Sequence, residues 1–439
     1  MKRIIYTLLL WLVCLPFLAN GSEADSVRVY VPNSDNPTVV AGTEIIPIDS
    51  TKVKKKKAKK PKKDKKFDFI FAGAPSYSKT TSLMLSVCGS GEYRFDRRDT
   101  LIEKSNVSIY ANASLNGVLT LGVMGKNFLP QDKARLNYDL FVQRTKARTW
   151  GIGIEDANRD DNETNFDRLQ LKFEPEFIYK VAKGFYAGVT INLERNNMWK
   201  LTNINQQWLK DAEVADPEVK KLEFFNEKGE LQNLHYFDHH IQAFGFGYTL
   251  NYDTRDFIRN ASKGINIRWS QMFYLNKLVG GKMKYDVPDA IKNVAAHSGF
   301  FTSDLTFNVY TTLWKDAILA YELHGRYNSG KDVPWVMMSE VGGSSRMRGY
   351  FLGRYRDKGL IETQIELRQH IWWRFGAVAW FGAANVFPKF NEIRLKESLL
   401  NAGVGLRFAF KPRINIRADF GFGKNGLGVV FGINEEFKR

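Results

Sequence analysis

The feature that most limits the fold of this chain is a series of segments, each about ten residues long, in which apolar and polar side chains alternate. Residues 360–371 are the clearest example. One face carries Ile361, Thr363, Ile365 and Leu367. The opposite face carries the charged and polar residues Glu362, Gln364, Glu366, Arg368 and His370. Because successive side chains of a β-strand point to opposite sides, this pattern predicts a strand with one apolar and one charged face.

The same alternation recurs along most of the chain, for example at 301–311, 317–328, 402–410 and 413–423. The pattern predicts 16 strands, at 82–95, 105–114, 116–126, 134–144, 147–155, 168–181, 184–196, 240–252, 264–276, 300–313, 316–328, 360–371, 374–386, 400–410, 413–423 and 427–434. Residues 67–77 are either a lead-in or a further strand, so the number is about 16. An even number is what a closed antiparallel barrel with both ends on one side requires.

The first 21 residues have the pattern of a secretory signal. Lys2 and Arg3 precede the apolar core 4–17, and Ala19-Asn20-Gly21 favours cleavage before Ser22. A lipoprotein signal at Cys14 is the weaker alternative, because Trp11-Leu12-Val13 lacks small residues. No later stretch is long and apolar enough for a membrane-spanning helix. Export combined with repeated alternation favours an all-β, transmembrane antiparallel β-barrel in the bacterial outer membrane, over residues 67–439, rather than a soluble β-sandwich.

Residues 22–66 are polar and Lys-rich, and we expect them to form a disordered periplasmic tether. The formal net charge of the chain is +17, but residues 52–66 alone hold eleven Lys and one Asp. These lysines stand in one run without aromatic residues, which disfavours nucleic-acid binding. The partners expected for the run are anionic lipid headgroups or an acidic protein, and a purely solvated spacer remains the alternative.

Loop lengths predict how the barrel is oriented. Short turns are expected at 180–183, 314–316, 372–374 and 411–412. They alternate with long connections at 156–167, 197–239, 276–299, 329–359 and 387–399. In outer-membrane barrels the short turns face the periplasm and the long loops face outward. Both termini are therefore expected in the periplasm.

The long connection before residue 360 contains Gly342-Gly343 and, shortly after, Arg348-Gly349-Tyr350. This sequence resembles the BamA/TamA surface-antigen family of outer-membrane barrels. The resemblance implies that this connection is the sixth outer loop, that it folds back into the lumen, and that Arg348 pairs there with the carboxylate of Glu366. A bidentate Arg–carboxylate pair would hold such a loop with a defined geometry. The alternative is that Arg348 is an ordinary solvated loop arginine.

Two further places match the same family. Asp253-Thr254-Arg255-Asp256, followed by Gly264, resembles its turn motif, and Pro75-Ser76-Tyr77-Ser78 resembles the beginning of its barrel. The family often has a second acidic partner on strand 13, where this chain has Gly382, so we expect a weaker clamp on the loop. Residues 22–66 are too short for a periplasmic POTRA domain, which predicts a barrel-only member.

The resemblance implies a barrel that assists insertion or translocation of proteins, or lipids, at the outer membrane through a lateral seam between its first and last strands. In the last strand, the segment 427–432 is short and contains glycines, so we expect its pairing to be weak. Because POTRA domains receive substrates in other members, we expect this barrel to work within a complex. A structural barrel without insertase activity and a passive pore are the alternatives. No enzyme, cofactor or metal site is expected. Adjacent His239 and His240 point to opposite faces of a strand. Residues 156–161 with Glu163 lack the spaced ligands of a Ca²⁺ site.

Overall fold

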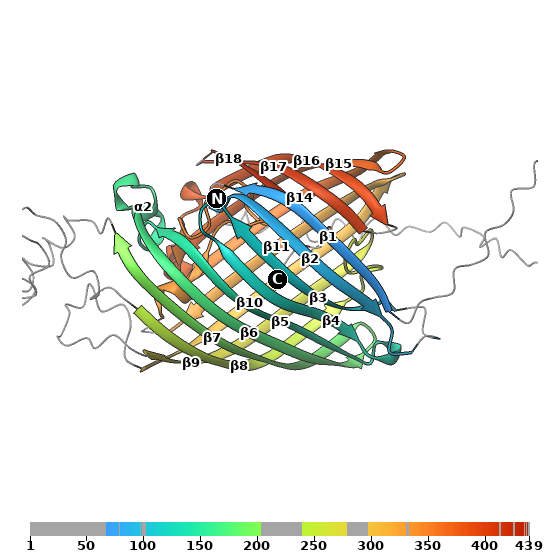
Figure 1. Ribbon diagram of the computed structural model, residues 1–439, viewed down its shortest axis with the longest axis horizontal. Coiled ribbons are helices and arrows are strands. Elements are labelled where there is room, and N and C mark those ends of the chain that lie inside the picture. The colour runs from blue at the N-terminus through green and yellow to red at the C-terminus, as the bar shows by residue number, and fades with distance from the viewer. Residues whose placement is uncertain are drawn as a thin grey trace, which may run out of the picture. The chain divides into compact units, whose positions relative to one another are not determined.

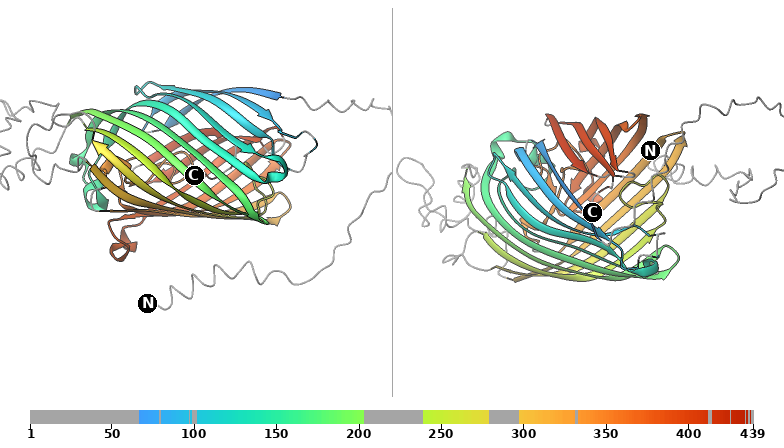
Figure 2. Two further views of the ribbon diagram at one scale, coloured as in Figure 1. Left: turned by 90° about the horizontal axis from the view of Figure 1, so that it is seen from below. Right: turned by 45° about the vertical axis from the view of Figure 1, so that its right-hand side comes forward.

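The computed structural model describes residues 67–437 except 79, 97, 99–101, 203–238, 279–296, 331–332, 412–413, 425, 434 and 436. Residues 67–433 form a closed antiparallel barrel of 16 strands, which confirms the expected fold class (Figure 1). The strands run obliquely to the barrel axis, as two further views show (Figure 2). The expected signal 1–21 and tether 22–66 lie outside the described residues.

In chain order the barrel strands are β1 (Phe67–Ser78), β2 (Ser82–Tyr93), β3 (Ser105–Ser114), β4 (Leu119–Phe128), β5 (Ala134–Thr149), β6 (Thr164–Ala182), β7 (Phe185–Thr202), β8 (His239–Asp253), β9 (Gly264–Leu278), β10 (His297–Trp314), β11 (Ala317–Ser329), β14 (Gly359–Trp372), β15 (Phe375–Phe387), β16 (Leu399–Lys411), β17 (Ile414–Gly423) and β18 (Gly426–Ile433). Each strand pairs with its neighbour in this order, and β18 pairs with β1 to close the wall.

One predicted strand is wrong. Residues 147–155 do not form a separate strand, because β5 runs on to Thr149 and residues Gly153–Ala157 form the short helix α2. The chain turns at Gly151 and Gly153, whose φ angles of 93° and 88° lie in the region that favours glycine. The total of 16 still holds, because residues 67–78 form a full strand. Among the described helices, none is long and apolar enough to cross a lipid bilayer.

The alternating pattern separates the two faces of the wall as predicted. In β14, Ile361 and Ile365 are 38% and 42% exposed on the outside, whereas Glu362 and Glu366 are 6% and 2% exposed. The register places Glu366 opposite Ala320 of β11 and Trp380 of β15. The charged faces of neighbouring strands therefore line one polar lumen, and the apolar faces form a surface suited to lipid.

Three short turns lie at the end of the barrel opposite to the long connections β5–β6, β11–β14 and β15–β16. The turns β6–β7, β10–β11 and β14–β15 contain two residues each. We call their end the short-turn end. The antiparallel topology brings the start of β1 and the end of β18 to this end. Exposed aromatic side chains gather at two of the turns: Trp314, Trp372, Trp373 and Phe375. Such a girdle is typical of the boundary between the hydrocarbon core and the headgroups.

The closure between β1 and β18 is the shortest ladder in the wall. These two strands are paired at a single position, Tyr77 opposite Val429. By contrast, β17 and β18 pair continuously from Gly423 opposite Gly426 to Ile416 opposite Ile433. Because each pair adds backbone hydrogen bonds and side-chain contacts, the β1–β18 seam is the weakest part of the barrel wall.

Candidate functional site: the lumenal loop clamp

The loop between β11 and β14 folds back into the lumen. Two short strands, β12 (Ser339–Glu340) and β13 (Arg356–Asp357), pair with each other at its base. Between them the chain contains Gly342, Gly343 and Gly349, with φ angles of 110°, 134° and 107°. At Gly349 an added Cβ would lie 2.5 Å from the carbonyl oxygen of Gly421, on β17. The absence of a side chain therefore lets the loop backbone lie directly against the wall.

Arg348 is fully buried and has partners on three strands. One terminal nitrogen lies 2.8 Å from Asp419 Oδ2 of β17. The other donates to Glu366 of β14 and, at 3.2 Å, to Gln364 Oε1. The guanidinium also lies 3.6 Å from the ring centroid of Trp380, on β15. A buried charge needs such partners, because its desolvation would otherwise disfavour the folded loop.

The structure thus brings Arg348 and Glu366 together, and it corrects the expectation of a weaker clamp. Gly382 supplies no acid, but Asp419 provides a second carboxylate from β17. Sequence reasoning missed this residue, although Asp419 stands on the polar face of the alternating segment 413–423. A search for every acid predicted to face the lumen would have included it.

Each clamp carboxylate is shared with a second arginine of the wall. Glu366 accepts hydrogen bonds from Arg368 at 2.8 and 3.0 Å. Asp419 accepts from Arg407 and, at 3.5 Å, from Arg417. Each carboxylate therefore has at least one arginine of the wall as a partner besides Arg348.

Arg346 provides a second anchor that the sequence did not indicate. Its guanidinium lies 2.7 Å from Glu322 Oε1 of β11 and 3.7 Å from Glu362 of β14. Burial alone would lower the pKa of Arg346, but the neighbouring Glu322 more than offsets this and raises it above its usual range. Glu322 also accepts from Gln364 at 2.6 Å. Two arginines of one loop are therefore bound by facing strands.

Tyr350 completes the contact between the loop motif and the wall. Its hydroxyl donates to the carbonyl of Leu400 at 2.7 Å and accepts from the backbone nitrogen of Lys424 at 3.1 Å. The ring covers Gly423, where an added Cβ would lie 2.4 Å from it. The motif Arg348-Gly349-Tyr350 thus binds along β16 and β17.

The turn motif lies at the short-turn end and stabilises the connection β8–β9. Asp253 binds Arg255 at 2.8 Å and Arg135 of β5 at 2.8 Å. Asp256 accepts from the backbone nitrogen of Ser262 at 2.9 Å, and Thr254 pairs with Ile265. Gly264 has a φ of 110°, and an added Cβ would lie 2.4 Å from the Thr254 carbonyl oxygen. These contacts favour a structural role for the motif.

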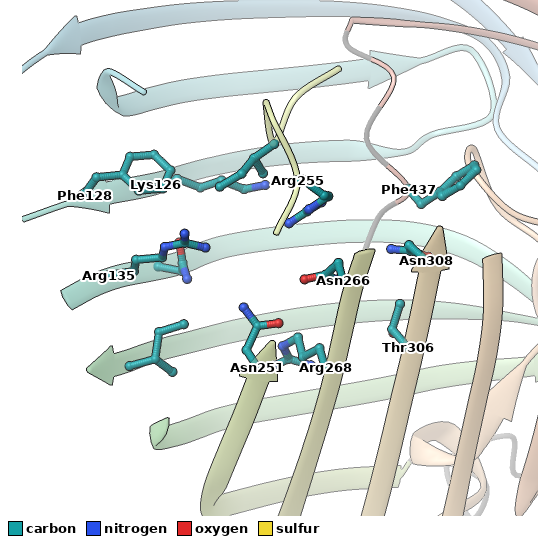
Figure 3. A pocket seen from close by; sticks show the side chains of 13 residues that line it. Lys126, Phe128, Arg135, Asn251, Arg255, Asn266, Arg268, Thr306, Asn308 and Phe437 are labelled. Carbon is teal, nitrogen blue, oxygen red and sulfur yellow. The ribbon is translucent and has the colours of Figure 1, made fainter. Parts of the chain in front are cut away.

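A cavity opens beside this turn inside the lumen (Figure 3). Its lining includes Arg135, Arg255 and Arg268, whose charges are balanced by Asp132, Asp253 and Glu176. Figure 3 also shows Phe437, near the C-terminus, at the edge of the cavity. The cavity is polar and its charges are largely compensated.

Two carboxylates of the acidic loop 156–163 form ion pairs. Asp160 lies 2.6 Å from Arg354, and Glu163 lies 3.0 Å from Arg148. In the part of the chain that the structure describes, no group of three His, Cys, Asp or Glu side chains is arranged to hold a metal ion. Asp238, next to the adjacent histidines, lies outside the described residues.

Residues 105–437 match the Omp85 superfamily domain, which confirms the family resemblance seen in the loop motif. Among solved structures, BamA from Haemophilus ducreyi lacking POTRA domains 1–3 is similar, with 10% identity, coverage of 84% of this chain and 70% of that chain, and a TM-score of 0.48. CdiB from Acinetobacter baumannii shows 13% identity, coverage of 84% and 60%, and a TM-score of 0.48.

CdiB from Escherichia coli shows 11% identity, coverage of 84% of this chain and 62% of that chain, and a TM-score of 0.49. The chain thus spans less than two thirds of the length of either CdiB. No matching sequence was found among curated proteins.

Proposed function

Because the chain belongs to the Omp85 superfamily of bacterial outer-membrane barrels, we propose that it assists insertion or translocation of proteins, or lipids, at that membrane as part of a complex. Residues 1–21 would direct export, and the short-turn end would face the periplasm together with residues 22–66. The observation that carries this proposal is the contact between the clamped loop and the strands that form the seam.

Gly349 of the loop motif touches both of the last two strands. An added Cβ on Gly428 of β18 would lie 2.8 Å from the Gly349 Cα, and one on Gly349 would lie 2.5 Å from the Gly421 carbonyl oxygen of β17. The loop therefore supports β17 and β18 from inside, close to the single β1–β18 pair. If Arg348 separated from Glu366 and Asp419, the loop would no longer support the wall where it is weakest.

A partner-dependent activity fits the character of the described surface. The outer wall is apolar, with exposed side chains such as Leu121, Phe246 and Leu406. Such a surface faces lipid and offers few polar groups to capture an unfolded client in water. Recognition of the client would then fall to other subunits. Isolated protein should fold into liposomes without accelerating insertion of another outer-membrane protein, and clear acceleration would contradict the need for partners.

A disulfide across the seam tests the proposal in cells. Tyr77→Cys and Val429→Cys place two thiols directly opposite each other on β1 and β18, in a chain with Cys14 and Cys88 replaced by serine. The control is Leu121→Cys with Val142→Cys, an outward-facing pair in the β4–β5 ladder. Oxidation of the seam variant should lower the amount of other outer-membrane proteins that reach their folded, heat-modifiable form, and a reductant should restore this amount. Oxidation of the control variant should not change it.

If both locked variants support assembly equally, seam opening is not part of the mechanism. If assembly continues with the seam locked but stops when the chain is deleted, the structural-barrel alternative is the correct one. The passive-pore alternative is disfavoured by the buried Arg348, because its loop occupies the lumen.

A further inference from the structure

Two residues beyond the last strand are buried inside the barrel. Strand β18 ends at Ile433, and Glu435 and Phe437 beyond it are only 3% and 6% exposed. A terminal segment without a binding site would be exposed and poorly ordered. These two residues therefore have a built site inside the barrel, which neither the loop motif nor the seam explains.

Glu435 is held by four polar groups. Its carboxylate lies 2.6 Å from Arg407 Nε and accepts a hydrogen bond from Asn415 Nδ2 at 3.1 Å. Its carbonyl oxygen accepts from Arg368 at 3.0 Å, and its backbone nitrogen donates to the Arg259 carbonyl at 3.0 Å. Both the side chain and the backbone of Glu435 are thus bound.

Phe437 fills an apolar site next to these polar contacts. Its ring stacks on Tyr310, with centroids 5.9 Å apart and planes inclined by 23°. Ala261 and Ala320 belong to the same buried cluster, and the Arg368 guanidinium lies 5.0 Å from the ring centroid. Phe437 also lines the lumenal cavity beside the β8–β9 turn (Figure 3). Loss of this ring would enlarge that cavity.

The two arginines that hold the tail also hold the clamp carboxylates. Arg368 binds Glu366, and Arg407 binds Asp419. Glu366 and Asp419 are in turn the partners of Arg348. Charge on Glu435 therefore affects how strongly Arg368 and Arg407 compete with Arg348 for the same two carboxylates.

We propose that Glu435 and Phe437 form a displaceable plug that closes the lumen at the short-turn end and is coupled to the loop clamp through Arg368 and Arg407. The plug lies outside every strand ladder that the structure describes, so it can open locally while the barrel stays folded. Withdrawal of Glu435 would leave Arg407 and Arg368 to the clamp carboxylates and thereby weaken their hold on Arg348.

A thiol beneath Phe437 reports directly on the plug. Ala320→Cys is placed in the barrel with Cys14 and Cys88 replaced by serine, and its reaction with a maleimide is measured. Glu435→Gln combined with Phe437→Ala should raise the labelling rate about tenfold or more, because the thiol is then accessible without local opening of the plug. Because loss of Glu435 should also loosen the Arg348 loop that occupies the lumen, the same double variant should raise ion conductance severalfold in planar bilayers. Glu435→Gln alone, which keeps the ring, should give a smaller increase in both.

The matched control is Phe390→Ala with Glu392→Gln, which removes the same two groups from the exposed loop between β15 and β16. It should change neither the labelling rate nor the conductance. Both outcomes are read only where the double variant of Glu435 and Phe437 is still heat-modifiable. An unchanged labelling rate would show that Phe437 does not cover the thiol. Faster labelling without a rise in conductance would show that the plug does not close the lumen. Arg348→Lys should also speed labelling of the thiol, and a wild-type rate in that variant would overturn the coupling.

Discussion

The Arg348 guanidinium lies 2.8 Å from Asp419 Oδ2, and both side chains are completely buried inside the barrel. The carboxylate belongs to β17, next to the last strand, whereas the arginine belongs to a loop 71 residues earlier in the chain. The pair therefore joins the lumenal loop to the strands beside the β1–β18 seam. The attraction within a buried ion pair offsets the desolvation of its two charges only when its geometry is good. The presence of this pair therefore favours a specific placement of the loop.

Removal of the clamp arginine should destabilise the barrel. Arg348→Ala leaves Glu366 and Asp419 with fewer positive neighbours, and we expect the free energy of unfolding to fall by about 3 kcal/mol. Arg348→Lys keeps the charge but loses the bidentate geometry, so its effect should be intermediate. The measurement is the heat-modifiability midpoint in detergent, together with protease cleavage in the loop 330–358.

Arg394→Ala is the control for this prediction, because Arg394 forms its ion pairs in an exposed loop. It should leave the midpoint and the cleavage pattern as they are in the unaltered chain. If Arg348→Ala behaves like this control, the buried pairing does not hold the loop.

Alternation along the strands predicted most of the fold because a lipid-facing side and a polar lumen impose opposite demands on neighbouring residues. The failure at 147–155 has a local cause. Trp150, Ile152 and Ile154 alternate like a strand, but Gly151 and Gly153 between them adopt positive φ angles and turn the chain. Apolar periodicity alone does not distinguish such a turn from a strand.

The clamp was only partly predictable. The pairing of Arg348 with Glu366 was predicted from a family motif. Asp419 and Trp380, however, contact Arg348 only once the barrel closes and the loop enters it. The contact between Glu322 and Arg346 has the same origin. Charge on a strand face shows that a residue points into the lumen, but it does not show which partner it meets across the lumen.

Two glycines of the loop should differ in their tolerance of alanine. Gly343 and Gly349 both have positive φ angles, so alanine is strained by about 1–2 kcal/mol at either place. At Gly343 an added Cβ would meet nothing within 4 Å, whereas at Gly349 it would collide with the backbone of Gly421. Gly349→Ala should therefore expose the loop to protease far more than Gly343→Ala. Equal cleavage of both variants would show that close contact with β17 is not needed.

The stability of the loop should depend on pH through Asp357. Burial raises the pKa of this carboxyl to about 6 from an ordinary value of 3.8, although the backbone nitrogen of Lys358 donates to it. A carboxyl with a raised pKa binds more protons in the folded loop than in the unfolded one. Its charged form therefore disfavours the folded loop above pH 6, and the penalty disappears as the pH falls toward 3.8.

The check is the rate of protease cleavage in the loop, measured at several values across this range. The unaltered loop should become better protected between pH 7 and pH 5, relative to Asp357→Asn, which keeps an acceptor oxygen for the Lys358 nitrogen but carries no charge. If the two proteins show the same pH profile, Asp357 does not control the loop.

The Lys-rich run 52–66 should bind anionic lipid. It contains eleven Lys and one Asp. Each lysine near a negatively charged membrane surface contributes about 1 kcal/mol, which salt screens within a Debye length. Deletion of 52–66 should lower binding of the protein to liposomes containing anionic lipid at low salt, and high salt should remove most of the difference. The control is deletion of residues 23–37, a segment of the same length with few basic residues. If the two deletions bind alike, or if salt has no effect on the intact chain, the run serves only as a solvated spacer.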